Sequence, residues 1–262
     1  MDQSTILLFL AALPVVAILV FVYFKDKNKE PMSLLIKLFL GGFASCALVI
    51  FASKFLGLFL PFMSTDLTYK SFLDTLLYAF IGVALVEELC KWVMVYWIGY
   101  NHKEFDELYD GLVYCTFVSL GFAFIENILY VVTTSSISTA FLRAVSAVPS
   151  HACDAIFMGY YVSAAKQFGL AGKKKTENHY LKLSVIVPTI LHGIYDFCLM
   201  SGYQSLLIIF FFFVVGLYVF SVRKLLSMSN NNRKIRYKNK FCGTCGKIVT
   251  GEYCANCGQR QE

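Results

Sequence analysis

The sequence has little charge for its length. Asp, Glu, Lys and Arg make up 15% of its 262 residues, against about 25% in ordinary soluble domains. In contrast, 58% of the residues are hydrophobic, 25 are Phe, and the mean hydropathy is +0.63. A soluble domain of this size could not bury so much apolar surface. The composition therefore excludes a soluble globular enzyme, a disordered chain and a small secreted disulfide protein.

The chain also lacks the ~10-residue alternating segments of a transmembrane β-barrel. It has continuous apolar runs, which a bilayer accepts as helices because a helix satisfies its own backbone hydrogen bonds. We therefore predict an all-α polytopic membrane protein with about seven transmembrane helices and a small C-terminal module. The predicted spans are Thr5–Phe24, Leu34–Leu58, Phe72–Ile98, Leu108–Val132, Phe141–Ala165, Leu181–Met200 and Leu206–Val222.

The first apolar run lacks the marks of a cleaved signal peptide. No cationic segment precedes it, and no small-residue cleavage site follows it; Lys25, Lys27 and Lys29 follow instead. We therefore predict a retained helix.

Positive charge is confined to alternate loops. Lysines follow the first, third and fifth runs, and a basic segment follows the seventh, whereas 61–70 has one lysine and 133–140 and 201–205 have none. The positive-inside rule then predicts a multi-pass cell-membrane protein with its N-terminus outside and its C-terminus in the cytoplasm. We expect the basic tail to contact anionic lipid of the bilayer rather than nucleic acid.

The composition becomes polar near Ser227 and then gives two Cys-x-x-Cys pairs. We predict a transmembrane domain over 1–226, a basic juxtamembrane linker over 227–240 and a zinc ribbon over 241–262. Four thiolates suit tetrahedral Zn²⁺, and the reducing cytoplasm disfavours the alternative of two disulfides. A closed four-cysteine site has no open position for catalysis, so we expect a structural zinc and a docking or sensing role toward a cytoplasmic partner. The predicted ligands are Cys242, Cys245, Cys254 and Cys257.

Chemistry must come from ionisable groups inside the predicted spans, where they are energetically costly and are functional candidates by default. Four successive spans each carry at least one carboxylate or imidazole. On the third, Glu87 and Lys91 share a helix face, with Glu88 about 100° away. The remaining polar residues of this kind are Glu126 and Asn127 on the fourth span, His151 and Asp154 on the fifth, and His192 and Asp196 on the sixth.

These groups also agree in depth. At ~1.5 Å of rise per residue and with the predicted topology, they occupy one layer between the mid-plane and the outer leaflet. Each alone has a structural explanation, such as an ion pair or interhelical hydrogen bonds. Together they can form a hydrolytic site, in which a glutamate activates water or two His and a carboxylate hold a catalytic zinc.

In order along the chain, the motifs resemble those of the PrsW family of intramembrane proteases, which is similar to the type II CAAX prenyl proteases. The resemblance covers roughly 34–200. It implies peptide hydrolysis in the membrane, with a single-span protein such as an anti-sigma factor as substrate, cut near its extracytoplasmic side. The motifs are Glu-Glu-x-x-Lys (Glu87, Glu88, Lys91), Phe-x-x-x-Glu-Asn (Phe122, Glu126, Asn127), His-x7-Gly-Tyr (His151, Gly159, Tyr160) and His-x-x-x-Asp (His192, Asp196).

The resemblance also implies residue roles. Glu87 corresponds to the water-activating glutamate, supported by Glu88 and Lys91. His192 and Asp196 correspond to the motif that polarises the scissile carbonyl in the CAAX relatives, although an ionised Asp196 accepts hydrogen bonds and cannot donate one. Glu126 stands where the CAAX relatives carry a histidine, which implies a catalytic residue that shares the water or binds a metal. Candidate ligands for a catalytic Zn²⁺ or other divalent metal are Glu126, His151 and His192, with Asn127 and Asp154 in supporting positions. These residues leave open whether a metal is needed.

Two other classes of protein compete with the intramembrane endopeptidase. An ion-coupled transporter also carries mid-membrane carboxylates, but it would often show inverted repeats, and none is visible in this sequence. A non-catalytic membrane scaffold or sensor could retain the fold, but we would expect it to have lost Glu87 or His192. We therefore favour the protease.

Overall fold

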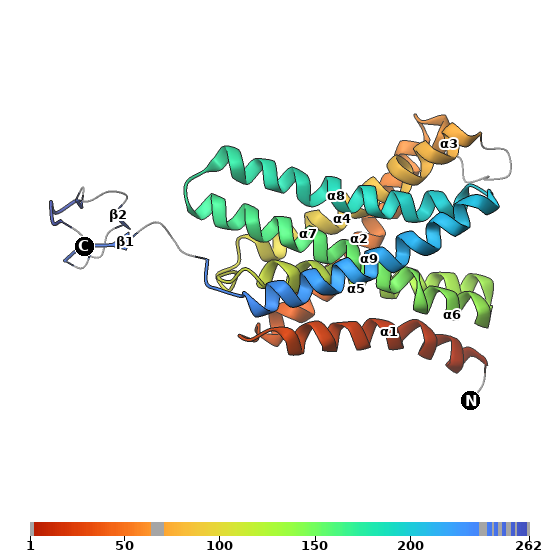
Figure 1. The fold of residues 1–262 in the computed structure, drawn as a ribbon, viewed down its shortest axis with the longest axis horizontal. Helices are drawn as coiled ribbons and strands as arrows, with labels where there is room; N and C mark the ends of the chain where they lie inside the picture. The colour runs from red at the N-terminus through yellow and green to blue at the C-terminus, as the bar shows by residue number, and fades with distance from the viewer. Residues whose placement is uncertain are drawn as a thin grey trace.

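The protein is a bundle of helices with a small cysteine-rich module at its C-terminal end (Figure 1). The computed structural model describes residues 3–63, 71–235, 240–242, 244–245, 248–249, 253–254 and 256–260. The helices are α1 (Gln3–Lys25), α2 (Met32–Gly57), η1 (Pro61–Met63), α3 (Phe72–Leu77), η3 (Tyr78–Leu85), α4 (Val86–Val95), η4 (Tyr96–Tyr100), α5 (Asp110–Thr134), α6 (Ile137–Val145), α7 (Ala147–Leu170), α8 (Lys174–Met200) and α9 (Gln204–Asn230).

The structure confirms the predicted all-α membrane fold. Five described helices are long and apolar enough to cross a bilayer: α1 from Thr5, α2, α5, α8 and α9. The predicted third span is one helical run over 72–100, made of α3, η3, α4 and η4. The predicted fifth span is divided at Ser146 into α6 and α7. Membrane crossing by these two stretches, and hence the total of seven, stays a prediction.

Helix α5 forms the centre of the bundle, packed between α2 and α7. Glycines allow these close approaches. A Cβ on Gly42 of α2 would overlap the backbone of α5 at Val118, and a Cβ on Gly159 of α7 would overlap the α5 backbone at Leu112. Small residues at such crossings are typical of helix packing in membranes. Gly159 of the His-x7-Gly-Tyr motif therefore serves packing.

The helix that carries the Glu-Glu-x-x-Lys motif is flanked by wider turns. The 8-residue η3 and the 5-residue η4 are π-helical and lie on either side of α4. Such turns inside a helix are frequent at functional sites because the extra residue changes the direction in which the following side chains point.

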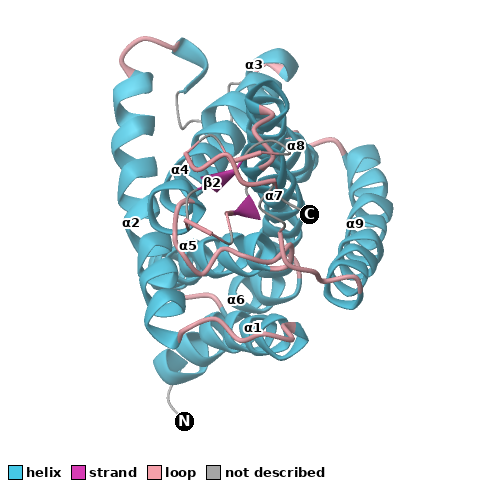
Figure 2. Ribbon diagram, turned by 90° about the vertical axis from the view of Figure 1, so that its left-hand side faces the viewer, coloured by secondary structure: helices cyan, strands magenta, loops and turns pink. Residues whose placement is uncertain are grey.

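The two ends of the bundle differ. In Figure 1 the N-terminus, α3 and α6 lie at one end, and the α7–α8 turn lies at the other, from which the chain leads to the cysteine module. Figure 2 shows α9 at the side of the bundle, next to α7 and α8. Helix α9 continues to Asn230, so the polar residues after Ser227 begin inside a helix rather than in a linker.

The chain beyond α9 first packs against the bundle. The side-chain oxygen of Asn232 accepts a hydrogen bond from the Tyr109 amide at 3.0 Å, and the Ile235 amide donates to the Asp106 carbonyl at 2.6 Å. Strands β1 (Lys240–Phe241) and β2 (Ile248–Val249) then pair antiparallel, with Lys240 opposite Val249.

Candidate active site

Helix α4 places three charged side chains in the interior of the bundle. The Lys91 ammonium lies 2.8 Å from Glu88 Oε1 and 3.2 Å from Glu87 Oε2. Lys91 and Glu88 are fully buried, whereas Glu87 retains 7% exposure. The predicted Glu87–Lys91 contact is thus formed. A buried charge needs such partners, since desolvation without them costs several kcal/mol.

His192 of α8 also lies close to the carboxylates of Glu87 and Glu88. Its Nδ1 lies 2.9 Å from Glu88 Oε1, and its Nε2 lies 3.9 Å from Glu87 Oε2. One helical turn later, Asp196 Oδ2 lies 3.4 Å from His192 Nε2. Asp154 of α7 lies close by, with its Oδ2 3.9 Å from Nδ1. Both imidazole nitrogens therefore face carboxylates, and a protonated His192 would be stabilised there.

His151 of α7 joins α4 to α5. Its Nδ1 lies 3.2 Å from the Lys91 ammonium, and its Nε2 lies 2.9 Å from Glu126 Oε2. Because an ammonium can only donate, His151 Nδ1 is the acceptor and Nε2 carries the proton toward Glu126. The rings of His151 and His192 are 5.2 Å apart between centroids. The charged and imidazole side chains of the four predicted motifs thus meet in one place, whereas Gly159 packs against α5 and Tyr160 contacts Lys224.

Arg143 of α6 is a member of this site that the sequence analysis missed. Its Nη2 donates to Glu126 Oε2 at 2.7 Å, and its Nε donates to Asn127 Oδ1 at 2.7 Å. Its guanidinium also lies 3.9 Å from the Tyr130 ring centroid. The sequence signal for Arg143 was a cation within a predicted span. No motif at helical spacing connected Arg143 to Glu126.

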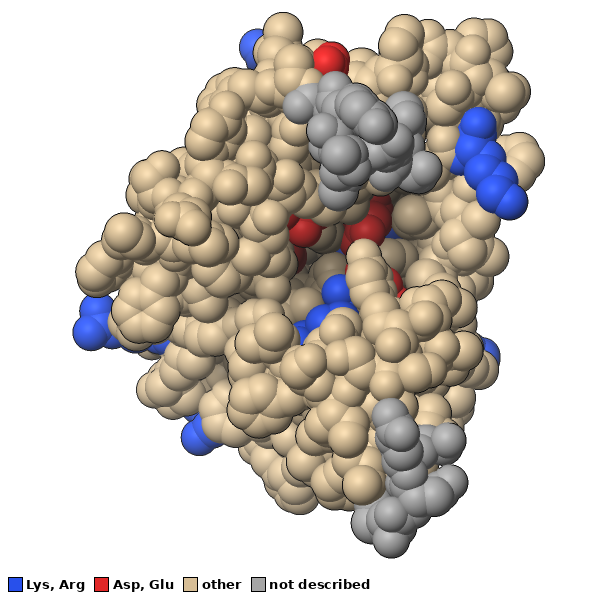
Figure 3. All heavy atoms as spheres, turned by 90° about the vertical axis from the view of Figure 1, so that its right-hand side faces the viewer, with Lys and Arg blue, Asp and Glu red and all other residues tan. Residues whose placement is uncertain are grey.

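A cavity of about 650 Å³ gives access to these groups. Figure 3, which views the end of the molecule with α3 and α6, shows a hollow with acidic atoms deep inside an otherwise mostly uncharged surface. Glu88 and Lys91 lie behind this lining. The acidic, basic and histidine residues at the cavity wall are Lys54, Glu87, Glu126, Arg143, His151, Asp154, His192 and Asp196.

The residues present fit a metal ion in their donor chemistry. One ligand atom each from Glu87, Glu88, His151 and His192 lies within 4.8 Å of the others, and imidazole with carboxylate is a usual zinc set. Buried oxygens of Glu88 and Asp154 also lack a hydrogen-bond partner within the part of the chain that the structure describes. Glu126, predicted as a ligand, lies outside this group and bonds to Arg143 instead. The Lys91 ammonium already contacts three members of the set.

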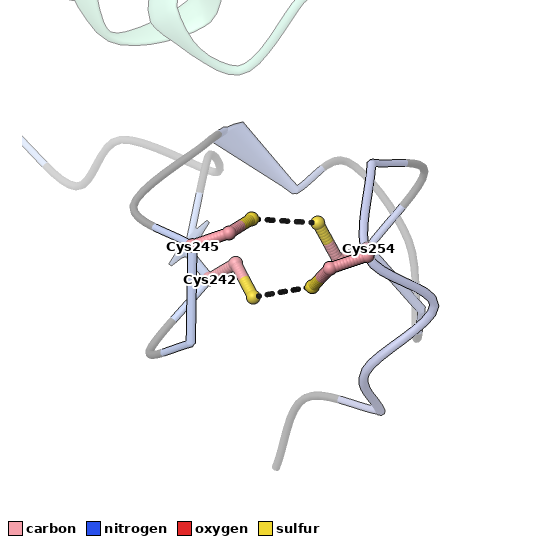
Figure 4. A group of neighbouring side chains, drawn as sticks. Cys242, Cys245 and Cys254 are labelled. Atoms are coloured by element: carbon pink, nitrogen blue, oxygen red, sulfur yellow. Dashed lines mark hydrogen bonds between the residues drawn. The ribbon is translucent and has the colours of Figure 1, made fainter.

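The C-terminal cysteines form a separate cluster. Cys242 Sγ lies 3.4 Å from Cys257 Sγ, and Cys245 Sγ lies 3.5 Å from Cys254 Sγ (Figure 4). These distances exceed the ~2.05 Å of a disulfide, and none of the four cysteines is disulfide-bonded. One sulfur from each lies within 4.8 Å of the others, as a single Zn²⁺ would require. Gly258 has φ of +72°, as expected for the turn after the second pair, whereas Gly246 lies outside the described residues.

Comparisons with known proteins identify the family of this chain. The family profile described as "PrsW family intramembrane metalloprotease" matches residues 30–222. The chain is 40% identical over 223 residues to Protease PrsW of Oceanobacillus iheyensis, covering 83% of this chain and 94% of that protein. It is 40% identical over 189 residues to that of Geobacillus kaustophilus (72% and 77%) and 34% identical over 212 residues to that of Bacillus subtilis (80% and 90%). No solved structure gives a significant match.

The matched profile and relatives, together with the polytopic helical bundle, place the chain in the class of intramembrane proteases. Within that class, the chain belongs to the PrsW family. The predictions of the family, of a multi-pass membrane protein and of an intramembrane endopeptidase are confirmed.

Proposed function

We propose that this protease cleaves single-span membrane proteins near the extracytoplasmic side, using water that Glu87 activates. The observation that carries this assignment is the difference between two adjacent carboxylates. Glu87 lines the cavity, where water and substrate can reach it, whereas Glu88 is fully buried and bonded to Lys91 and His192. A general base must reach the proton that it removes, and Glu87 meets this condition.

The other residues hold the base and complete the site. Lys91 holds the Glu87 side chain and balances its charge, and Glu88 holds Lys91 in place. His192 Nδ1 is held by Glu88, and its Nε2 lies 3.4 Å from Asp196 on the Glu87 side of the cavity. When His192 is protonated, the Nε2–H can turn from Asp196 to donate to the oxygen of the scissile carbonyl. This removes the difficulty with Asp196, which needs to act only as an acceptor for His192.

A bound metal would be held by Glu87, His151 and His192, with Glu88 as a further donor within reach. It would supply Lewis-acid polarisation of the carbonyl or lower the pKa of a bound water. Its binding requires Lys91 to release the contacts it makes with Glu87, Glu88 and His151.

The proposed sidedness places the N-terminus outside and the C-terminal ribbon in the cytoplasm. The lysine-rich loops and the α7–α8 turn then lie inside, and the end where the cavity opens lies outside. This orientation supports cleavage of an extracytoplasmic segment, as in an anti-sigma factor, and leaves the ribbon available to a cytoplasmic partner.

The test compares two matched substitutions in proteoliposomes with a panel of single-span substrates. Glu87→Gln keeps the size and some hydrogen bonding but removes the base, and we expect cleavage to fall by ~10²–10⁴. Glu88→Gln should retain more activity, because Lys91 keeps Glu87 as a partner. Glu104→Gln, at a half-buried loop position away from the cavity, is the control. Wild-type cleavage by a folded Glu87→Gln protein would exclude Glu87 as the base.

A further inference from the structure

A second cavity lies on the side of the bundle, away from the residues of the active site. It is an apolar groove of about 630 Å³ between α9 and the pair α7 and α8. Phe157 of α7 and Leu191 of α8 form one wall, and Phe213 and Phe220 of α9 form the other. Gly216 lies between these two phenylalanines, and a Cβ built on it would have no neighbour within 4 Å. The groove is therefore open at its middle.

The packing of α9 explains why the groove exists. Its buried residues are Leu217, Ser221, Leu225 and Ser229, which recur every four positions and form one narrow stripe. Side chains of α7 and α8 do not fill the space beside this stripe. From Phe212 to Lys224 the groove extends for roughly 18 Å along the helix, at 1.5 Å per residue.

One end of the groove is cationic. Arg223, Lys224 and Ser227 line it, and Lys224 Nζ lies 3.3 Å from the ring centroid of Tyr160 on α7. Lys224 thus reaches across from α9 to α7 and closes that end. Among the residues that the structure describes, no carboxylate forms an ion pair with Arg223 or Lys224. Two cations without an acidic partner favour an anionic ligand.

We propose that this groove is a binding site for an anionic phospholipid, with the acyl chain along Gly216 and the phosphate on Arg223 and Lys224. A long apolar slot that ends in two cations and a hydroxyl matches such a lipid in shape and charge. A phosphate ion alone would leave the apolar slot unused. A transmembrane peptide would leave the two cations without a counter-charge.

The site is independent of the proteolytic chemistry, but the two share their helices. Leu191 in the groove wall adjoins His192 of the active site, and Phe157 lies one turn after Asp154. A lipid in the groove would therefore support α7 and α8 from behind, which makes the geometry of the active site sensitive to the composition of the bilayer.

The test uses the purified full-length protein, delipidated in detergent and then exposed to phosphatidylglycerol or phosphatidylcholine with identical acyl chains. Native mass spectrometry measures the bound lipid. Wild type should retain phosphatidylglycerol preferentially. Arg223→Gln with Lys224→Gln should bind it roughly 25-fold more weakly, the effect of two basic contacts near a membrane surface. Gly216→Leu fills the slot without changing charge, and it should reduce retention of both lipids.

The matched control is Lys173→Gln with Lys175→Gln, which removes the same charge at the same end of the bundle but outside the groove. It should bind as wild type does, with all variants checked for unchanged helicity and thermal midpoint. Equal retention of the two lipids, an equal loss in the control, or normal retention in Gly216→Leu would overturn the proposal. Cross-linking of a substrate peptide at position 216 without displacement of bound lipid would also overturn the proposal.

Discussion

Arg143 holds the Glu126 side chain in position. It donates to Glu126 and Asn127 at once, and its side chain is 15% exposed. A hydrogen bond to a charged group contributes about 1.5–3 kcal/mol. We expect Arg143→Gln to lower kcat by roughly 10- to 100-fold, because Glu126 and its partner His151 lose their fixed positions.

The conservative variant separates positioning from general destabilisation. Arg143→Lys keeps the charge and should recover part of kcat, while KM for a single-span substrate changes little in either variant. If Arg143→Lys and Arg143→Gln are equally impaired, or if KM alone changes, Arg143 does not act by positioning Glu126.

Glu30 gives a prediction about pH at the bundle end that carries the α7–α8 turn. The pKa of Glu30 is raised from 4.5 to about 7, mainly by burial. The charges of Asp26 and Glu104 also raise this pKa, whereas hydrogen bonds with the Tyr114 hydroxyl and Asp110 lower it. The Tyr114 hydroxyl donates to Glu30 Oε2 at 3.0 Å. The native state thus binds this proton more tightly than the unfolded chain does. Between pH 4.5 and 7 the free energy of unfolding therefore falls as pH rises.

Glu30→Gln removes that penalty and keeps an acceptor for Tyr114. Its thermal midpoint should exceed that of wild type at pH 8, by roughly 2–4 °C for each kcal/mol recovered, and approach wild type at pH 5. Midpoints from intrinsic fluorescence, with exposed Lys175→Gln as the reference, test this. A larger stabilisation at pH 5 than at pH 8 would contradict the assignment.

At the scale of elements, the segment after α9 belongs to the bundle although the cysteine module is a separate unit. Ile235 is 3% exposed, and Leu108 donates to the Arg233 carbonyl at 3.2 Å. A chain ending at Asn230 would lose these contacts, with net hydrogen bonds of about 1 kcal/mol each. We expect 1–230 to melt earlier than wild type and 1–235 to melt with it.

The 1–235 chain should also cleave a short membrane substrate at the wild-type rate and contain one Zn²⁺ fewer per molecule than the full chain. Cys245→Ser in the full chain should lose the same single zinc. Metal analysis beside the cleavage assay measures both. Loss of activity in a folded 1–235 protein would show that the ribbon is part of the catalytic unit.

The whole molecule has the burial pattern of a membrane protein. Glu88 and Lys91 are fully buried, whereas Phe51 and Trp97 are 71% and 72% exposed. Lipid in place of water covers the apolar surface, and polar groups gather inside. The α5–α6 connection and the start of α8 lie at opposite ends of the bundle, so a probe at each end reports the orientation.

One cysteine added at Ser138 or at Asn178, in a chain without the ribbon, tests the proposed sidedness. Both positions are exposed, and the remaining native cysteines lie in the helices. An impermeant maleimide added to intact cells should label Ser138→Cys and not Asn178→Cys. The reverse pattern would place the cavity on the cytoplasmic side and remove the extracytoplasmic cleavage proposal.

The fold class could be predicted from the sequence alone, and the sequence also pointed to most of the charged residues that the structure brings together. Long apolar runs permit helices alone in a bilayer, and contacts such as Glu87–Lys91 and His192–Asp196 follow from the four-residue repeat of one helix. The zinc module was also readable, because its two cysteine pairs are local. In each case the relevant spacing is short and lies within one element.

Tertiary structure decided what depends on how separate helices pack. The Arg143–Glu126 pair joins α6 to α5. The division at Ser146 that creates α6 comes just before Pro149, but proline alone does not predict it, because Pro14 and Pro188 lie inside unbroken helices. Which of Glu87 and Glu88 faces the cavity depends on the rotation of α4 against α7 and α8. That rotation is set by the sum of many interhelical contacts, such as the glycine crossings, and no local spacing encodes it.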